Sequence, residues 1–179
     1  MPLSPTAWQL QRDSGFQWNQ GDYSVPKLDL DTIPQSNATG YPEPFDKPVA
    51  GRWYRRLGPV NGLTKMGVSH VTLEPGAWSS QRHWHREEDE FVVMLSGEAV
   101  LIDDAGEHVM RAGDCATFPA GEANGHHLQN RTDQPCVFIA VSAGDKARDS
   151  GEYPDVDLIF GPDGYARKDG TPYSAKRVA

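Results

Sequence analysis

Near the middle of the chain the sequence reads His83-Trp84-His85-Arg86-Glu87-Glu88-Asp89-Glu90. Alternate residues of a β-strand point to the same face, so His83 and His85 would present two imidazole rings side by side. The four residues after His85 can turn the chain and return Glu90 on the next strand. Two imidazoles and one carboxylate would then converge, a ligand set that suits iron, manganese, nickel, copper or zinc.

A second polar group begins 35 residues after Glu90 and reads Gly125-His126-His127-Leu128-Gln129-Asn130. Adjacent side chains of a strand point to opposite faces, so only one of His126 and His127 can share a centre with His83. Taken singly, each pattern has a plainer interpretation. A His-x-His pair is more often a surface or structural feature, and an acidic run is usually a solvated face.

Short apolar runs recur through the centre of the chain. They are Gly67–Leu73, Phe91–Leu95, Ala99–Ile102, Cys115–Phe118 and Cys136–Ser142. The Gly, Pro and Asp clusters between these runs, without a long helical periodicity, predict an antiparallel all-β sandwich or barrel. Because Phe91–Leu95 is apolar at every position, we expect that strand to be covered on both faces, by the N-terminal arm or by a partner.

The flanks differ from the centre, and we divide the chain into three parts. Seven of the fourteen prolines fall in the first 48 residues, which excludes long helices there. We therefore expect an extended, proline-rich N-terminal arm over residues 1–50 and the barrel over residues 51–145. Residues 146–179 are predicted to form a C-terminal extension with a strand over Val156–Phe160.

Within the arm, the alternation over Leu28–Thr32 predicts one short strand. The arm also carries Trp8, Phe16 and Trp18. We expect these large apolar side chains to lie on the barrel or on a neighbouring subunit.

The composition excludes several classes of partner. The 179 residues carry a net charge of −8, which repels nucleic-acid backbones and anionic membrane surfaces. No apolar run approaches the roughly 18–20 residues of a membrane helix, and the first residues lack the features of a signal peptide. Two cysteines make no disulfide framework, so we expect a cytoplasmic protein.

The two histidine-bearing stretches together resemble the paired motifs of the cupin superfamily. The first reads Gly76-(x6)-His83-x-His85-(x4)-Glu90-(x6)-Gly97, and the second reads Gly113-(x5)-Pro119-x-Gly121-(x4)-His126-(x3)-Asn130. Two spacings depart from the usual pattern. The first glycine is one residue further from His83, and the loop before His126 is two residues longer. The gap from His126 to Asn130 fits the family and favours His126 over His127.

The resemblance implies a small single-domain, metal-binding cupin with a double-stranded β-helix (jelly-roll) barrel. It implies one divalent metal ion per subunit, Fe(II), Mn, Ni or Zn, held by His83, His85, Glu90 and His126. Three neutral imidazoles and one carboxylate would leave a +1 site with open positions. Metal affinity should then fall below roughly pH 6.5, where imidazoles take up protons. Cupins commonly pair through edge strands, so we expect a homodimer.

An enzyme is the favoured function, acting on a small oxygen-rich substrate (carboxylate, diketone or sugar-like) that chelates the metal. Both dioxygenase and isomerase or lyase chemistry fit this site, and no residue marks the general base. The alternative is a cupin that binds or senses a small molecule without turnover. A structural cupin with no metal is the third interpretation, which the complete ligand set opposes.

Structural roles are predicted for the other notable side chains near the motifs. These are His70, Gln81, Arg82, Trp84, Arg86 and His108, of which the two arginines should form surface salt bridges. Cys115 and Cys136 fall in apolar runs and are predicted to be buried, reduced thiols.

Overall fold

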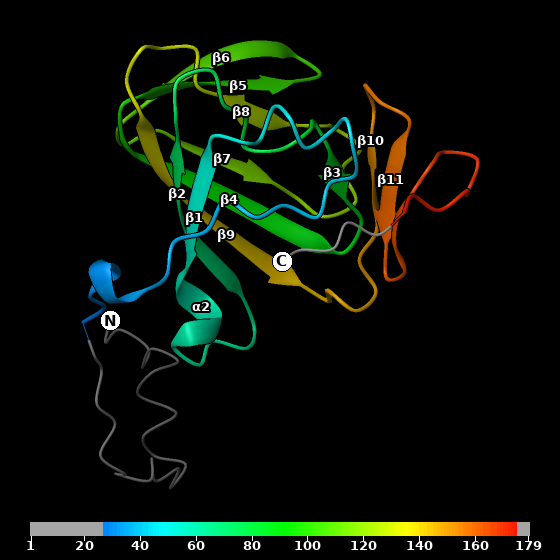
Figure 1. Ribbon diagram of the computed structural model, residues 1–179, viewed down its shortest axis with the longest axis horizontal. Helices are drawn as coiled ribbons and strands as arrows, with labels where there is room; N and C mark the ends of the chain where they lie inside the picture. The colour runs from blue at the N-terminus through cyan, green and yellow to red at the C-terminus, as the bar shows by residue number, and fades with distance from the viewer. Residues whose placement is uncertain (1–26, 175–179) are drawn as a thin grey trace, which may run out of the picture.

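The computed structural model describes residues 27–174, and their regular structure is almost entirely β (Figure 1). The largest sheet has five antiparallel strands in the order β1 (Arg52–Arg56), β2 (Gly67–Leu73), β9 (Cys136–Gly144), β4 (Glu88–Ser96) and β7 (Cys115–Phe118). A three-stranded sheet contains β6 (Gly106–Arg111), β5 (Glu98–Asp103) and β8 (His127–Gln129). The two helical elements among these residues are η1 (Leu30–Thr32) and α2 (Leu57–Val60).

The main core lies between these two sheets. Its buried side chains include Leu73, Met94 and Phe138 from the five-stranded sheet and Leu101 and Leu128 from the three-stranded sheet. Because alternate residues of each strand point inward, both sheets contribute an apolar inner face to one core. The predicted all-β double-stranded β-helix is confirmed.

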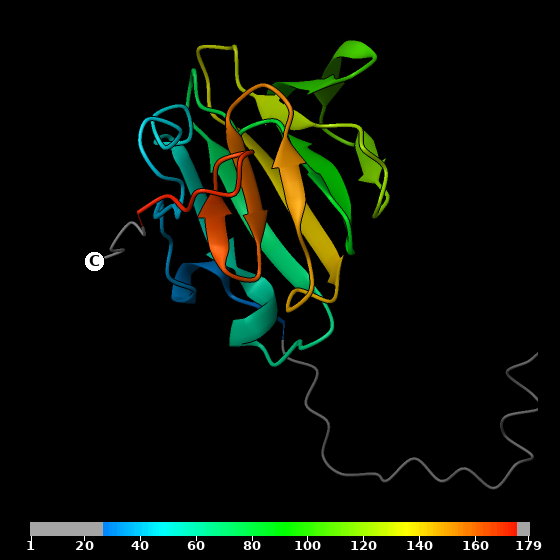
Figure 2. The same cartoon turned by 90° about the vertical axis from the view of Figure 1, so that its right-hand side faces the viewer.

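A third sheet closes one end of the barrel. It has four strands in the order β12 (Gly164–Ala166), β11 (Leu158–Gly161), β10 (Gly151–Tyr153) and β3 (Trp84–His85). Figure 2 shows its C-terminal strands facing the viewer. Since β10 pairs with β3, the C-terminal hairpin lies directly beside the first histidine motif.

The segment before β1 pairs with the edge of the five-stranded sheet and packs against the third sheet. Ser36 pairs through its backbone with Tyr54 of β1, at N–O distances of 3.0 and 2.8 Å. Further along, Tyr41 and Val49 are buried with Tyr153 and Leu158 in a second apolar cluster. This part of the predicted arm is therefore held on the barrel by both backbone and side-chain contacts.

Most predicted strands occur where expected. Two have the predicted bounds, Gly67–Leu73 and Cys115–Phe118, while the strand expected over Val156–Phe160 occurs as Leu158–Gly161. The strand predicted over Leu28–Thr32 is wrong, because Leu30–Thr32 is a 3-10 helix. Asp29 causes the difference: its carboxylate accepts the Asp31 N–H, a local bond that competes with extended structure.

The arm's large apolar residues Trp8, Phe16 and Trp18 lie outside the described residues, so the prediction of what they contact stays a prediction. Among residues 27–174, no helix is long and apolar enough to cross a membrane. The compartment is likewise still a prediction.

Strand β4 is covered on one face within this chain. Val92 and Met94 point into the core and are buried, whereas Phe91 and Val93 are half-buried and Leu95 is 47% exposed. The described part of the chain therefore does not cover the outer face as Phe91–Leu95 led us to expect.

The two cysteines differ in environment. Cys136 is buried as predicted, and burial raises the pKa of its thiol to about 11. The prediction that Cys115 is buried is wrong, because Cys115 is exposed. It lies at the start of β7, an edge strand, on the face that points away from the core.

Candidate metal centre

Three short backbone pairings bring the predicted ligands together. His83 and His126 form an isolated antiparallel bridge, with N–O distances of 3.2 and 2.9 Å in the two directions. Residues opposite each other in such a pair present their side chains to the same face. His85 lies on β3 opposite Gly151, and Glu90 lies on β4 opposite Phe118 of β7.

The side chains meet around one oxygen. Glu90 Oε2 lies 3.0 Å from His126 Nε2, 3.6 Å from His85 Nε2 and 3.9 Å from His83 Nε2. The candidate ligand atoms of His83, His85 and Glu90 all lie within 4.8 Å of one another. His126 joins this group through Glu90, and its ring stacks on that of Phe118 at a centroid distance of 3.5 Å.

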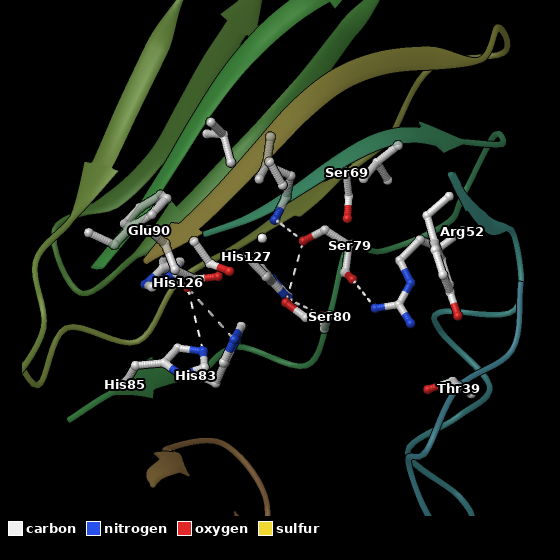
Figure 3. A pocket seen from close by; sticks show the side chains of 18 of the residues that line it. Thr39, Arg52, Ser69, Ser79, Ser80, His83, His85, Glu90, His126 and His127 are labelled. Carbon is white, nitrogen blue, oxygen red and sulfur yellow. Dashed lines mark hydrogen bonds and ion pairs between the residues drawn. The ribbon is translucent and has the colours of Figure 1, made fainter. Parts of the chain in front are cut away.

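These side chains line a cavity of about 510 Å³ inside the barrel. Figure 3 shows the histidines and Glu90 at one end, Arg52 at the opposite end, and Ser79 and Ser80 between them. The segment over 38–41 forms part of the wall, so the N-terminal region contributes directly to the pocket. A volume of this order accommodates a small, polar organic molecule.

Comparison with known proteins shows which family has this architecture. Residues 69–142 match the Cupin_2 family, which is a cupin domain. The crystal structure of a sugar phosphate isomerase of the cupin superfamily, from Silicibacter pomeroyi DSS-3, is 47% identical in sequence with a TM-score of 0.78. The match covers 84% of this chain and 98% of that one. The chain belongs to the cupin superfamily.

Two further relatives of this cupin are more distant. A protein from Acidithiobacillus ferrooxidans ATCC 23270, provisionally named a sugar phosphate isomerase, is 26% identical with a TM-score of 0.61, over 71% of this chain and 81% of that one. The oxalate decarboxylase of Bacillus subtilis (strain 168) is 34% identical over 93 residues. Those residues make up 49% of this cupin but only 22% of the decarboxylase.

Each histidine of the cupin centre has a fixed ring orientation. The Nδ1 atoms of His83 and His126 lie 3.0 and 3.2 Å from the carbonyl oxygens of Gln81 and Asn124. Since a carbonyl only accepts, these Nδ1 atoms carry ring protons, and in its neutral form each ring presents an unprotonated Nε2 atom to Glu90. Three nitrogen lone pairs facing a carboxylate repel one another unless a cation or proton lies between them. The donor set therefore fits a divalent metal.

The electrostatics of the centre favour a neutral His83 ring and an ionised Glu90 carboxylate. Burial, assisted by the nearby charges of His85 and His126, lowers the pKa of His83 to about 4, against the opposing effect of Glu90. Burial by itself would raise the pKa of Glu90, but the close approach of His126 and the electrostatic effect of the three imidazoles outweigh it and lower that pKa to about 2. Both are the protonation states that metal ligation requires.

The metal-free cupin should lose stability as pH falls from 6.5 towards 4, by up to about 1.4 kcal/mol per pH unit from His83 alone. The unfolded chain binds a proton on His83 at its ordinary pKa of 6.5, whereas the folded protein binds it only near 4. The unfolded state therefore holds more protons in this window, and acidification favours it. Urea midpoints of chelator-treated wild type and His83→Gln between pH 7 and 4.5 measure the effect. Equal losses in the two proteins would contradict it.

Asp149 is a site residue that the sequence analysis missed. Its Oδ2 lies 2.5 Å from His85 Nδ1, and its Oδ1 accepts the Glu87 N–H at 3.1 Å. The side chain is 7% exposed although it belongs to a charged segment that resembles a solvated loop. No local pattern marks this carboxylate, because it reaches His85 only when the chain after β9 returns to β3.

His127 occupies a separate environment from His126. Its Nδ1 lies 2.9 Å from the Ser80 carbonyl, its Nε2 lies 3.1 Å from Gln129 Nε2, and its ring packs edge-on against Trp78. Burial lowers its pKa as well, so the ring is neutral. The geometry brings His126, rather than His127, to Glu90.

The neighbouring side chains make contacts that agree with the structural roles expected for them. Arg82 pairs with Asp104 and Asp155, and Arg86 pairs with Glu152. Trp84 is buried and Gln81 donates to the Phe45 carbonyl. His108 is exposed on β6, and His70 lies on β2 outside the pocket.

Proposed function

We propose that this cupin is a metal-dependent isomerase that interconverts aldose and ketose phosphates. The observation that carries the proposal is the convergence of three imidazoles and one carboxylate at one end of a polar, 510 Å³ cavity. The 47% identical relative named as a sugar phosphate isomerase, almost all of which this chain covers, gives the same class of substrate.

His83, His85, Glu90 and His126 are the proposed ligands of one divalent ion, whose identity among Fe(II), Mn, Ni and Zn is open. A bound ion of this kind supplies Lewis-acid polarisation to the carbonyl oxygen and the adjacent hydroxyl oxygen of the substrate. This makes the C–H bond on the carbon next to the carbonyl more acidic. Glu90 is the one carboxylate among the described residues that line the cavity, so ligation and charge balance both fall to it.

Three tyrosines next to the centre, of which Tyr41 and Tyr153 are buried and Tyr165 is half-buried, would orient the sugar. The ring of Tyr153 stacks on His83 at 5.5 Å and lies 5.7 and 6.3 Å from the rings of Tyr41 and Tyr165. Burial raises the pKa of all three phenols, so they remain protonated hydrogen-bond donors at neutral pH. In this role they hold substrate oxygens without removing protons from them. The apolar rings of Phe118 and Phe160 in the cavity wall limit access of water.

Elemental analysis and a turnover assay test the proposal together. Protein purified without chelators should contain about one metal ion per chain and interconvert members of a panel of aldose and ketose phosphates by NMR. Chelation should abolish turnover reversibly, and His83→Ala should lower kcat/KM by at least ~10³-fold with the barrel still folded. A sugar phosphate that binds and stays intact would identify a binding protein instead. Consumption of dioxygen during turnover would favour dioxygenase activity over isomerase activity.

A second copy of the chain is the proposed partner of the outer face of the five-stranded sheet. Phe91 and Val93 of β4 lie opposite Val141 and Ile139 of β9, which places an apolar patch on that face. Leu95 extends it, and the described residues leave it 47% exposed. Light scattering should give about twice the 19.7 kDa chain mass. Leu95→Lys should reduce that to the chain mass, and a monomeric wild type would contradict the proposal.

A further inference from the structure

The wall of the cavity opposite the histidines is basic. Arg52, Tyr54 and Arg56 alternate along β1, so all three side chains face inward, and all three line the cavity. The guanidinium carbons of Arg52 and Arg56 lie 5.6 and 5.4 Å from the centroid of the Tyr54 ring. Two cations thus flank one aromatic ring on the inner face of an edge strand, and Figure 3 shows Arg52 across the cavity from His83.

Neither of these arginines forms an ion pair among residues 27–174. Six other arginines do pair with carboxylates, namely Arg82, Arg86, Arg111, Arg131, Arg148 and Arg167. The chain carries a net charge of −8, so acidic partners are abundant elsewhere on it. Arg52 is half-buried and Arg56 is exposed. A half-buried cation without a counter-ion, such as Arg52, is unfavourable unless a ligand supplies the negative charge.

The guanidinium of Arg52 is oriented and incompletely bonded. Its Nη1 donates to the Ser79 carbonyl at 2.7 Å, which fixes the plane of the group. Its Nε is buried and has no hydrogen-bond partner. A buried donor without an acceptor costs free energy, and a planar fork with a free N–H edge matches the oxygens of a phosphate.

We propose that Arg52, assisted by Arg56, binds the phosphate group of a phosphate monoester substrate. This inference rests on the proposed function and assigns the two ends of the substrate: adjacent sugar oxygens at the histidines and the phosphate at β1. Two unpaired cations match a dianionic phosphate better than a singly charged carboxylate. Ser79 acts as a positioning residue, since its carbonyl fixes the Arg52 guanidinium.

Calorimetry on the chelator-treated full chain tests this subsite without the metal. Near pH 8 the protein should bind ribose 5-phosphate, and should bind ribose and acetate at least ~10-fold more weakly. Arg52→Gln should raise the Kd for ribose 5-phosphate at least ~10-fold. Arg56→Gln, which leaves the bond to Ser79 intact, should weaken binding in the same direction. Circular dichroism checks that each variant is folded.

Arg55→Gln is the matched control, because it removes the same charge from the same strand on the outward face. It should leave the Kd within about twofold of wild type. Equal weakening by Arg52→Gln and Arg55→Gln, or equal affinity for ribose and its phosphate, would overturn the subsite. Phosphate binding that depends on Arg52 in a protein without isomerase activity would support the subsite and reject the proposed function. Turnover with an unchanged KM in Arg52→Gln would support the proposed function and reject the subsite.

Discussion

His126→Ala should weaken metal binding at least ~100-fold, whereas the neighbouring His127→Ala should change it by less than about threefold. His126 Nε2 lies 3.0 Å from Glu90 Oε2, and its backbone pairs with that of His83. The His127 ring is instead held by the Ser80 carbonyl and Trp78. Removing it leaves the four proposed ligands in place.

Competition between the protein and a coloured chelator for Zn²⁺ measures both affinities, and thermal unfolding of the metal-free variants separates loss of ligation from loss of fold. The two substitutions are matched, since each removes one buried imidazole from adjacent positions. Metal retention by His126→Ala together with metal loss by His127→Ala would reverse the assignment.

Asp149→Asn should weaken metal binding by about 10–100-fold while the barrel remains folded. The Asp149 carboxylate accepts the His85 Nδ1 proton, which fixes the ring orientation and makes Nε2 more basic. An asparagine keeps the shape but removes the negative charge and can present an N–H to the same ring atom. His85 would then turn or change tautomer.

Asp145→Asn is the control for this substitution, because Asp145 lies in the same segment but is exposed and accepts only from nearby backbone. The absorption spectrum of the Co²⁺-loaded protein reports ligand geometry directly. We expect it to shift in Asp149→Asn and to stay unchanged in Asp145→Asn. Identical spectra and affinities in all three proteins would show that Asp149 does not position His85.

Much of the barrel was predictable because strand ends are marked locally. Gly67–Leu73 and Cys115–Phe118 have their predicted bounds, since glycine, proline and aspartate end strands through backbone conformation and local hydrogen bonds. At Gly97 the backbone adopts a φ of +72° and a Cβ would lie 2.8 Å from that of Cys136, so a glycine turn is required there. The strand predicted over Leu28–Thr32 does not form, because the Asp29 carboxylate accepts the Asp31 N–H and this local hydrogen bond outweighs the alternation.

The sequence by itself determined the barrel and the four candidate ligands. Strand alternation places His83 beside His85, and a short turn returns Glu90, so local rules suffice for these three. The barrel topology and His126 came from the resemblance to the cupin motifs. Only the tertiary structure decided which groups surround them: Asp149 behind His85, Tyr41 from the N-terminal segment, and Arg52 across the cavity. Those side chains approach through pairings between strands far apart in the chain, and no residue spacing records where such strands meet.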